Sequence, residues 1–136
     1  MTPVNQSSES EQASLNILII DDETLVTRVL GRVFRGHALT VTHTVHDAIA
    51  NQERGGWGFD VALCDVLLPP YNGLDFYEAC RGASPGLEER IIFMSGGVVD
   101  SELSRRVKAL SNLHVEKPFD LMALREMVIG VARRLR

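Results

Sequence analysis

Four apolar runs of this chain each lead into polar residues of a type that binds metal ions or phosphoryl groups. The runs are 16–20, 61–64, 91–94 and 113–115, and the polar residues beyond them are Asp21, Asp22, Asp65, Ser95 and Lys117. Short β-rich runs separated by helical patterns are typical of parallel strands. The carboxyl ends of parallel strands meet at one edge of a sheet, and ligands bind in the crevice outside that edge. The sequence therefore predicts that three carboxylates, a hydroxyl and an ammonium group converge on one small site.

Apolar residues at helical spacing fill most segments between these runs. We expect helices over 23–35, 45–54 and 73–81, a fourth marked by Leu103, Val107 and Leu110, and a last one from Leu121 to Leu135. The expected N-cap is Asp100 or Ser101 for the fourth helix and Asp120 for the last. With a further strand at 39–43, strands and helices alternate along the chain. This alternation predicts an α/β fold with a doubly wound sheet and five helices.

Length and composition limit the classes of function. The 136 residues fit one domain over 15–136, and we expect residues 1–14, which are polar and Ser-rich, to be a disordered tail or linker remnant. A formal net charge of −4 gives no general attraction to nucleic acid. Cys64 and Cys80 lack metal-binding spacing and are expected to be reduced. No run reaches the roughly 18 apolar residues that span a membrane, and no signal peptide is visible, so we expect a cytoplasmic protein without membrane contacts.

Asp21, Asp22 and Asp65 form an acidic group at the expected sheet edge. Mg²⁺ prefers oxygen ligands such as carboxylates, together with waters and phosphate oxygens. Because no His or Cys joins the three acids, the set suits Mg²⁺ or Mn²⁺ and not zinc. An alternative is that adjacent acids at the end of a strand only cap the following helix. The presence of Asp65 and Lys117 favours the metal site.

Asp65 is the best candidate nucleophile. A carboxylate can attack phosphorus to form an acyl phosphate, provided that cations neutralise the charge that accumulates. A metal ion and Lys117 would supply these cations. Ser95, followed by Gly96 and Gly97, offers a hydroxyl and accessible backbone N–H groups to phosphoryl oxygens. Taken one at a time, a strand-end Asp or a Ser-Gly-Gly segment also fits an ordinary turn or loop.

Together these residues resemble the receiver domain of two-component response regulators. The family pattern is an acidic pair after the first strand, an Asp after the third with Pro and Gly beyond it, a Ser or Thr after the fourth, and Lys-Pro after the fifth. In this chain the matching residues are Asp21, Asp22, Asp65, Pro69, Gly73, Ser95, Lys117 and Pro118. The resemblance implies a flavodoxin-like five-stranded parallel sheet with strand order 2-1-3-4-5. Segments 93–97 and 115–120 also resemble receivers attached to hybrid histidine kinases.

The resemblance implies a role for each acidic residue of the site. Asp65 would accept a phosphoryl group from the phosphohistidine of a histidine kinase or a histidine phosphotransfer protein. Asp22, Asp65 and the backbone carbonyl of Leu67 would bind Mg²⁺ directly. Asp21 would act on the metal mainly through water.

The same resemblance implies roles on the opposite side of the site. Lys117 would pair with the phosphoryl group, Ser95 would turn to hydrogen-bond it, and the bond between Lys117 and Pro118 would be cis. Three residues before the lysine, where the family usually has Tyr or Phe as a rotameric switch, this chain has His114. Phosphorylation is then expected to alter the surface of the fourth helix, fifth strand and fifth helix, through homodimerisation or binding of a downstream protein.

The expected function is therefore a phosphorylation-controlled signalling module that catalyses only its own phosphorylation and dephosphorylation. One alternative is a metal-dependent phosphotransferase, which needs a general acid or base near Asp65 that Val66, Leu67 and Leu68 do not supply. Another is a protein-binding module of the same fold that works without phosphorylation, which has no need for the full set of site residues. Leu67 and Gly97 carry no polar side chain to orient water, so hydrolysis of the acyl phosphate is expected to lack that help.

Overall fold

The computed structural model describes residues 14–96 and 102–135, and five parallel strands form the sheet at its centre. These strands are β1 (Asn16–Ile20), β2 (Ala38–Thr42), β3 (Val61–Asp65), β6 (Ile91–Gly96) and β7 (His114–Lys117). Their order is β2-β1-β3-β6-β7. When the strands of this sheet are counted along the chain, this is the order 2-1-3-4-5. The expected fold class is confirmed.

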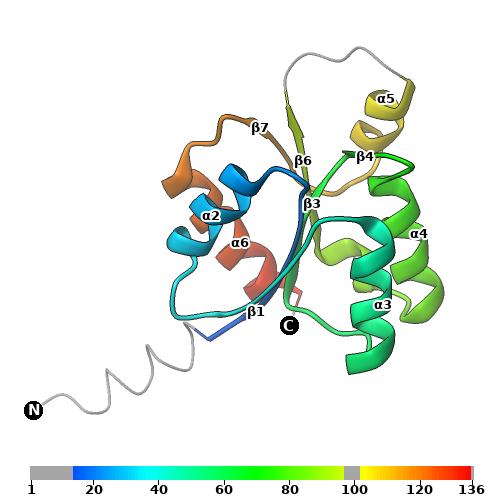
Figure 1. Ribbon diagram of the computed structural model, residues 1–136, viewed down its shortest axis with the longest axis horizontal. Coiled ribbons are helices and arrows are strands. Elements are labelled where there is room, and N and C mark those ends of the chain that lie inside the picture. The colour runs from blue at the N-terminus through cyan, green and yellow to red at the C-terminus, as the bar shows by residue number, and fades with distance from the viewer. Residues whose placement is uncertain (1–13, 97–101, 136) are drawn as a thin grey trace, which may run out of the picture.

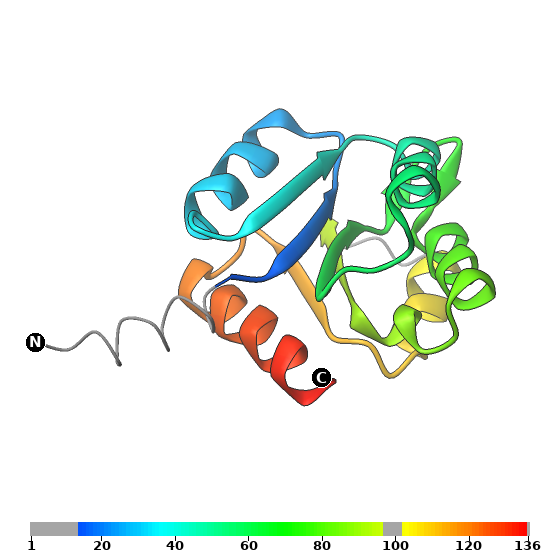
Figure 2. The same cartoon turned by 90° about the horizontal axis from the view of Figure 1, so that it is seen from below.

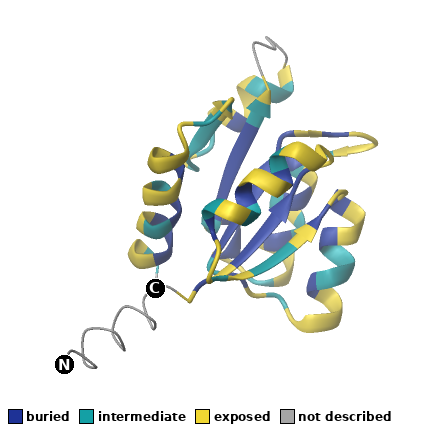
Figure 3. Ribbon diagram, turned by 60° about the vertical axis from the view of Figure 1, so that its left-hand side comes forward, coloured by how far each residue is buried: buried dark blue, intermediate teal, exposed yellow. Residues whose placement is uncertain are grey.

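Among the described residues, five α-helices cover both faces of the sheet (Figures 1 and 2). One face carries α2 (Thr24–Val33) and α6 (Leu121–Arg134), and the other carries α3 (Val45–Gly55), α4 (Gly73–Ala83) and α5 (Glu102–Lys108). A short 3-10 helix, η1 (Leu87–Arg90), leads into β6. Because helices cover both faces, the central strands β1, β3 and β6 are apolar and buried along most of their length (Figure 3).

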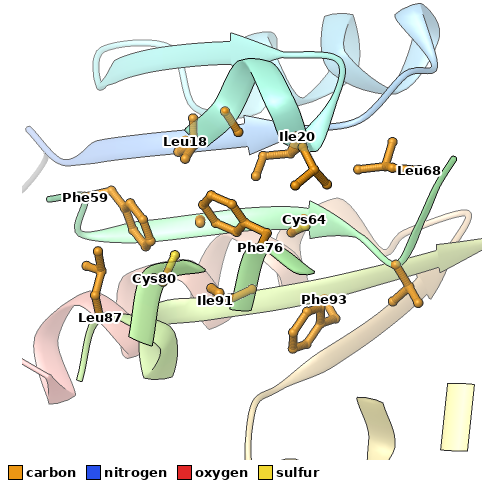
Figure 4. Close-up of a cluster of buried hydrophobic side chains, with 14 of the residues drawn as sticks. Leu18, Ile20, Phe59, Cys64, Leu68, Phe76, Cys80, Leu87, Ile91 and Phe93 are labelled. Carbon is orange, nitrogen blue, oxygen red and sulfur yellow. The ribbon is translucent and has the colours of Figure 1, made fainter. Parts of the chain in front are cut away.

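Two apolar clusters hold the layers together. Leu18 and Ile20 of β1 belong to the cluster under α3, α4 and α5, where Phe76 is fully buried (Figure 4). Ile17 and Ile19, which alternate with them, belong to the cluster under α2 and α6. Burial of one such side chain stabilises the fold by about 1.5–3 kcal/mol. A shift of β1 by one residue would exchange all four side chains between the two clusters, so this packing fixes the register of β1.

The expected helices are present, and the ends of α2, α3, α4 and α6 lie within two residues of the expected ones. The side chain of Asp120 caps α6 as expected and accepts a hydrogen bond from the Ala123 N–H. In contrast, α5 ends at Lys108, and Leu110 lies in the bend that follows. The Leu110 N–H donates to the Val107 carbonyl, three residues back, so the last turn tightens and α-helical bonding stops. The expected caps Asp100 and Ser101, the tail over 1–13, and Gly97 lie outside the described residues.

Cys64 and Cys80 are free and buried. Burial raises the pKa of the Cys80 thiol to about 12 and that of the Cys64 thiol well above its usual value, so both remain protonated and unreactive. Within residues 14–96 and 102–135, no helix combines the length and the apolar character that are needed to cross a membrane.

A small antiparallel hairpin connects β3 to α4 and was not predicted from the sequence. It consists of β4 (Leu67–Leu68) and β5 (Tyr71–Asn72), with a cis peptide bond between Pro69 and Pro70 at its tip. A capping box follows: the Asn72 side chain accepts from the Asp75 N–H, and the Asp75 carboxylate accepts from the Asn72 N–H. The hairpin and cap together fix the segment that leaves the predicted site after β3.

Gly73 allows the start of α4 to pack against the chain just beyond β3. Its N–H donates to the Val66 carbonyl over 2.8 Å. A Cβ atom at position 73 would lie 3.0 Å from the ring of Phe93 and 3.3 Å from the Val66 Cα. Phe93 is fully buried and close-packed, so it has little room to move aside. A larger residue would therefore displace the backbone next to Asp65.

We expect Gly73→Ala to lower the free energy of unfolding by about 1–3 kcal/mol, as overpacking of a core does. Gly82→Ala is the matched control, because Gly82 lies in the same helix and an added Cβ there meets nothing within 4 Å. The control should be neutral or stabilising by up to about 1 kcal/mol, since alanine favours helices more than glycine does. Urea unfolding followed by circular dichroism measures both. Equal stability of the two variants would contradict the close contact.

Candidate functional site

The parallel sheet brings the predicted side chains to one edge. Asp21 directly follows β1, and Asp65 is the last residue of β3. Ser95 is the second-last residue of β6, and Lys117 is the last residue of β7. All four strands point to the upper edge of the sheet in Figure 1, where their carboxyl ends meet. The convergence expected from the sequence is therefore present in the fold.

The Lys117 ammonium group lies at the centre of this edge. Its Nζ atom is 2.7 Å from Asp21 Oδ2, 2.6 Å from Glu23 Oε1 and 3.0 Å from Asp65 Oδ2. It donates hydrogen bonds to Glu23 and Asp65 and forms an ion pair with Asp21. Asp21 is fully buried and Asp65 nearly so. Buried carboxylates require such a cationic partner, because desolvation of an unpaired charge is costly.

Asp21 is anchored from two sides. Its Oδ1 atom accepts a hydrogen bond of 2.8 Å from the Glu23 N–H. Its Oδ2 atom is fully buried and has the ion pair with Lys117, but no well-aligned hydrogen bond from any described residue. That oxygen thus retains a lone pair for a further cationic or hydrogen-bonding partner.

Burial and charge shift the pKa values of the central pair in the same direction. Burial raises the pKa of the Asp65 carboxyl, and the contacts with Lys117 and the Leu67 N–H offset this only in part. Burial alone would lower the pKa of Lys117, but its close contacts with the carboxylates of Asp21, Glu23 and Asp65 outweigh this effect and raise it. Lys117 therefore remains an ammonium group at neutral pH.

The raised pKa of Asp65 leads to a prediction about stability. A group whose pKa is raised by folding contributes stability below its unfolded pKa, and this contribution is lost as the pH rises through the folded pKa. At neutral pH the charged Asp65 therefore opposes folding. We expect Asp65→Asn to raise the free energy of unfolding at neutral pH without divalent cations, and to raise it less at acidic pH. Urea unfolding at the two pH values measures this. A less stable variant at neutral pH would mean that the ion pair with Lys117 outweighs burial.

The carboxylates of the site also suit a divalent cation. Asp21, Asp22, Glu23 and Asp65 each place an oxygen within 4.8 Å of the others. Asp22 and Glu23 are exposed and leave the group open to solvent. An all-oxygen set of this kind fits Mg²⁺ or Mn²⁺. The buried Oδ2 of Asp21, which lacks a hydrogen bond, supports the same fit. Leu67, the expected carbonyl ligand, stands two residues beyond Asp65, and its N–H donates to Asp65 Oδ1.

Glu23 is the member of this group that our sequence analysis missed. Its signal was present, because it directly follows Asp22 and prolongs the acidic pair to three acids. The position of its side chain depends on Lys117, which lies 94 residues away. A strand-end pattern alone does not predict such a contact.

Ser95 lies at the same edge and His114 begins β7, and both are outside the ion-pair network. Ser95 is half-buried and pairs in register with Glu116, and His114 pairs with Phe93. Among the described residues, no hydrogen bond or ion pair joins Ser95 or His114 to Asp65 or Lys117. Burial lowers the pKa of His114 and favours its neutral ring. The Lys117–Pro118 peptide bond is cis, as the resemblance implies.

The geometry and the family comparison agree. The family profile described as "Response regulator receiver domain" matches residues 17–129. The chain belongs to this family. Receiver domains are phosphoacceptor signalling modules of two-component systems, and the acidic site of this receiver domain is consistent with that role.

Several curated response regulators are similar to this receiver domain. It is 28% identical over 127 residues to the probable transcriptional regulatory protein TcrX of Mycobacterium tuberculosis, covering 90% of this chain and 50% of that protein. It is 24% identical over 126 residues to a chemotaxis protein CheY homolog of Campylobacter jejuni, covering 86% of this chain and 92% of that protein. The chain spans about half the length, or less, of TcrX and the other first curated relatives that it matches.

Solved structures show the same fold. A CheY-like response regulator receiver domain protein from Methanospirillum hungatei aligns with a TM-score of 0.74 and 25% identity, covering 90% of this chain and 97% of that one. A structure described as the BeF3-activated DrrB receiver domain aligns with a TM-score of 0.73 and 21% identity, covering 89% of this chain and 99% of that one.

Proposed function

We propose that this receiver domain accepts a phosphoryl group on Asp65 from a histidine kinase or a histidine phosphotransfer protein, and that phosphorylation changes its protein contacts. The observation that carries the proposal is the contact of 3.0 Å between Lys117 Nζ and Asp65 Oδ2, inside a group of carboxylates that suits a divalent cation. A nucleophilic carboxylate and a neutralising ammonium group are both required to form an acyl phosphate.

The proposed reaction is an in-line transfer at phosphorus. A carboxylate oxygen of Asp65 attacks the phosphorus of a phosphohistidine, the P–N bond breaks, and the departing imidazole keeps the electron pair and takes a proton. Lys117 donates hydrogen bonds to the oxygens on which negative charge accumulates. Mg²⁺, held by Asp22, Asp65 and the Leu67 carbonyl and through water by Asp21, would supply the remaining charge neutralisation. Water later attacks phosphorus and releases phosphate from Asp65.

The proposed output lies on the surface of α5, β7 and α6. Ser95 would turn toward the phosphoryl group, and His114 would follow as the switch residue. The neutral form of His114, which burial favours, suits such a movement into the core. The contact made by this surface would be a second copy of the chain or a downstream protein.

Asp65→Asn should abolish the mass gain of the protein when it is incubated with Mg²⁺ and a small phosphodonor such as acetyl phosphate. The expected gain in the unaltered protein is one phosphoryl group, because the two carboxylate oxygens of Asp21 are already paired with Lys117 and the Glu23 N–H. Intact-mass spectrometry measures it. Asp47→Asn, an exposed acid in the first turn of α3, is the control and should be labelled normally.

Labelling of Asp65→Asn would remove Asp65 as the acceptor. If the unaltered protein gained no mass at all, the alternative of a phosphorylation-independent binding module would be favoured instead.

An apolar groove next to the site suggests where the phosphodonor protein binds. It lies between Leu25 and Val29 of α2 and Phe119 and Leu121 beyond β7, and Lys117 borders both this groove and the acidic site. Leu25 is 75% exposed, which is unusual for so large an apolar side chain. A donor that presents a phosphohistidine to Asp65 must cover this edge of the molecule. We therefore propose that it lays an amphipathic helix into the groove.

Charge adds to this description of the donor. Arg28 and Arg32 are exposed and lie four residues apart on α2, so they share one side of the helix. α2 has no acidic residue in its first turn. We propose that the helix of the donor carries acidic side chains opposite these arginines, because complementary charge speeds and orients docking.

Leu25→Ala should slow phosphotransfer from a phosphohistidine protein about fivefold or more, because truncation of a buried interface anchor commonly costs more than about 1 kcal/mol. It should leave labelling by acetyl phosphate unchanged, since a small donor does not use the groove. Val41→Ala, which alters an exposed apolar residue on β2, is the control. Equal slowing with both donors would place Leu25 in the chemistry of the site, and no slowing with either would exclude the groove.

A further inference from the structure

The side chain of Glu23 is directed to Lys117 and not to its own helix. Glu23 stands at the N-cap of α2, where its side chain makes no capping hydrogen bond. Its Oε1 atom instead lies 2.6 Å from Lys117 Nζ, the shortest of the three contacts of that ammonium group. A carboxylate near a helix N-terminus is already favoured by the helix dipole, so the contact with Lys117 adds to a favourable position.

Three carboxylate oxygens lie within 3.0 Å of Lys117 Nζ while Asp65 is unmodified. Those of Glu23 and Asp65 accept hydrogen bonds from the ammonium group, and that of Asp21 forms an ion pair with it. A phosphoryl oxygen that takes a hydrogen bond from Lys117 must therefore displace one of these carboxylates. The free-energy cost of that displacement depends on which carboxylate leaves.

Glu23 is the carboxylate that can leave at the lowest cost. Asp21 is fully buried, and Lys117 is the cation paired with its Oδ2 atom, so loss of the contact would leave a buried charge without compensation. Asp65 is the residue that carries the phosphoryl group. The side chain of Glu23 is 58% exposed, so water can replace the ammonium group as its partner.

We propose that Glu23 holds Lys117 while Asp65 is unmodified and releases it to the phosphoryl group, so that Glu23 weakens the phosphorylated state. This inference rests on the proposed function, because it requires a phosphoryl group on Asp65. Glu23 is a positioning residue that acts through Lys117 and makes no contact with the transferred group. Its contact with Lys117 is lost in the phosphorylated protein, whereas the contact between Lys117 and Asp21 is kept.

Binding of beryllofluoride, a stable mimic of the phosphoryl group, tests the proposal at Mg²⁺ concentrations that saturate each variant. Isothermal titration calorimetry gives the dissociation constant. Glu23→Gln should bind about two- to fivefold more tightly than the unaltered protein, the range expected when an exposed ion pair no longer has to be broken. Glu116→Gln is the matched control. Glu116 is exposed and adjacent to Lys117 in β7, and successive side chains of a strand point to opposite faces of the sheet. It should change the dissociation constant little.

Glu23→Asp separates the contact with Lys117 from a general effect of negative charge. This variant keeps the charge but shortens the side chain by one methylene group, so the carboxylate no longer reaches Lys117 Nζ. The proposal expects Glu23→Asp to bind beryllofluoride more tightly than the unaltered protein, as Glu23→Gln does. A general charge effect expects the aspartate variant to match the unaltered protein, and that result would overturn the proposal.

Two further outcomes distinguish this inference from the proposed function. Weaker binding by Glu23→Gln would overturn the inference alone and would indicate that Glu23 is a ligand of the metal ion. If neither the unaltered protein nor Glu116→Gln bound beryllofluoride, the proposed function itself would fail, and the role of Glu23 would fail with it.

Discussion

The rest of the site depends on the position of one ammonium group. Lys117 ends β7, one of the two edge strands, yet its partners are Asp65 at the end of β3 and Asp21 directly after β1. The ion pairs therefore reach across the end of β6 and join strands that share no backbone hydrogen bonds. Without this cation, two buried carboxylates would face each other in a medium that screens charge poorly. One side chain thus makes the acidic site compatible with a folded protein.

The sequence predicted the sheet and the main site residues because both depend on local signals. Each apolar run is long enough for a strand, and parallel topology then places the residues that follow, such as Asp65 and Lys117, at one edge. The cap of α6 by Asp120 is equally local, since the acceptor and the Ala123 N–H are three residues apart. The resemblance to a known family contributed the strand order and the cis bond before Pro118, which residue patterns alone do not determine.

The features that the sequence did not predict arise from tertiary contacts. The strands of the β4–β5 hairpin are two residues each, too short for a periodicity signal, and the hairpin is held between β3 and the cap of α4. The early end of α5 follows from one bond of Leu110 to a carbonyl three residues back. The contact of Glu23 with Lys117 requires the start of α2 and the end of β7 to meet. Side-chain spacing along the chain contains no information on that meeting.

The charges of the site predict that the proposed phosphorylation and the binding of a divalent cation are coupled. Four carboxylates, from Asp21, Asp22, Glu23 and Asp65, face one ammonium group, so the site carries a formal charge of −4 + 1 = −3 when all are ionised. Phosphorylation of Asp65 replaces one carboxylate charge with a phosphoryl group of about −1.5 to −2 at neutral pH, so the site becomes more negative by about 0.5 to 1. A divalent cation offsets that increment, so each ligand strengthens the binding of the other by the same factor. Loss of Glu23 from Lys117 then moves one exposed negative charge away from the phosphoryl group as it arrives, which lowers the repulsion that the cation must overcome.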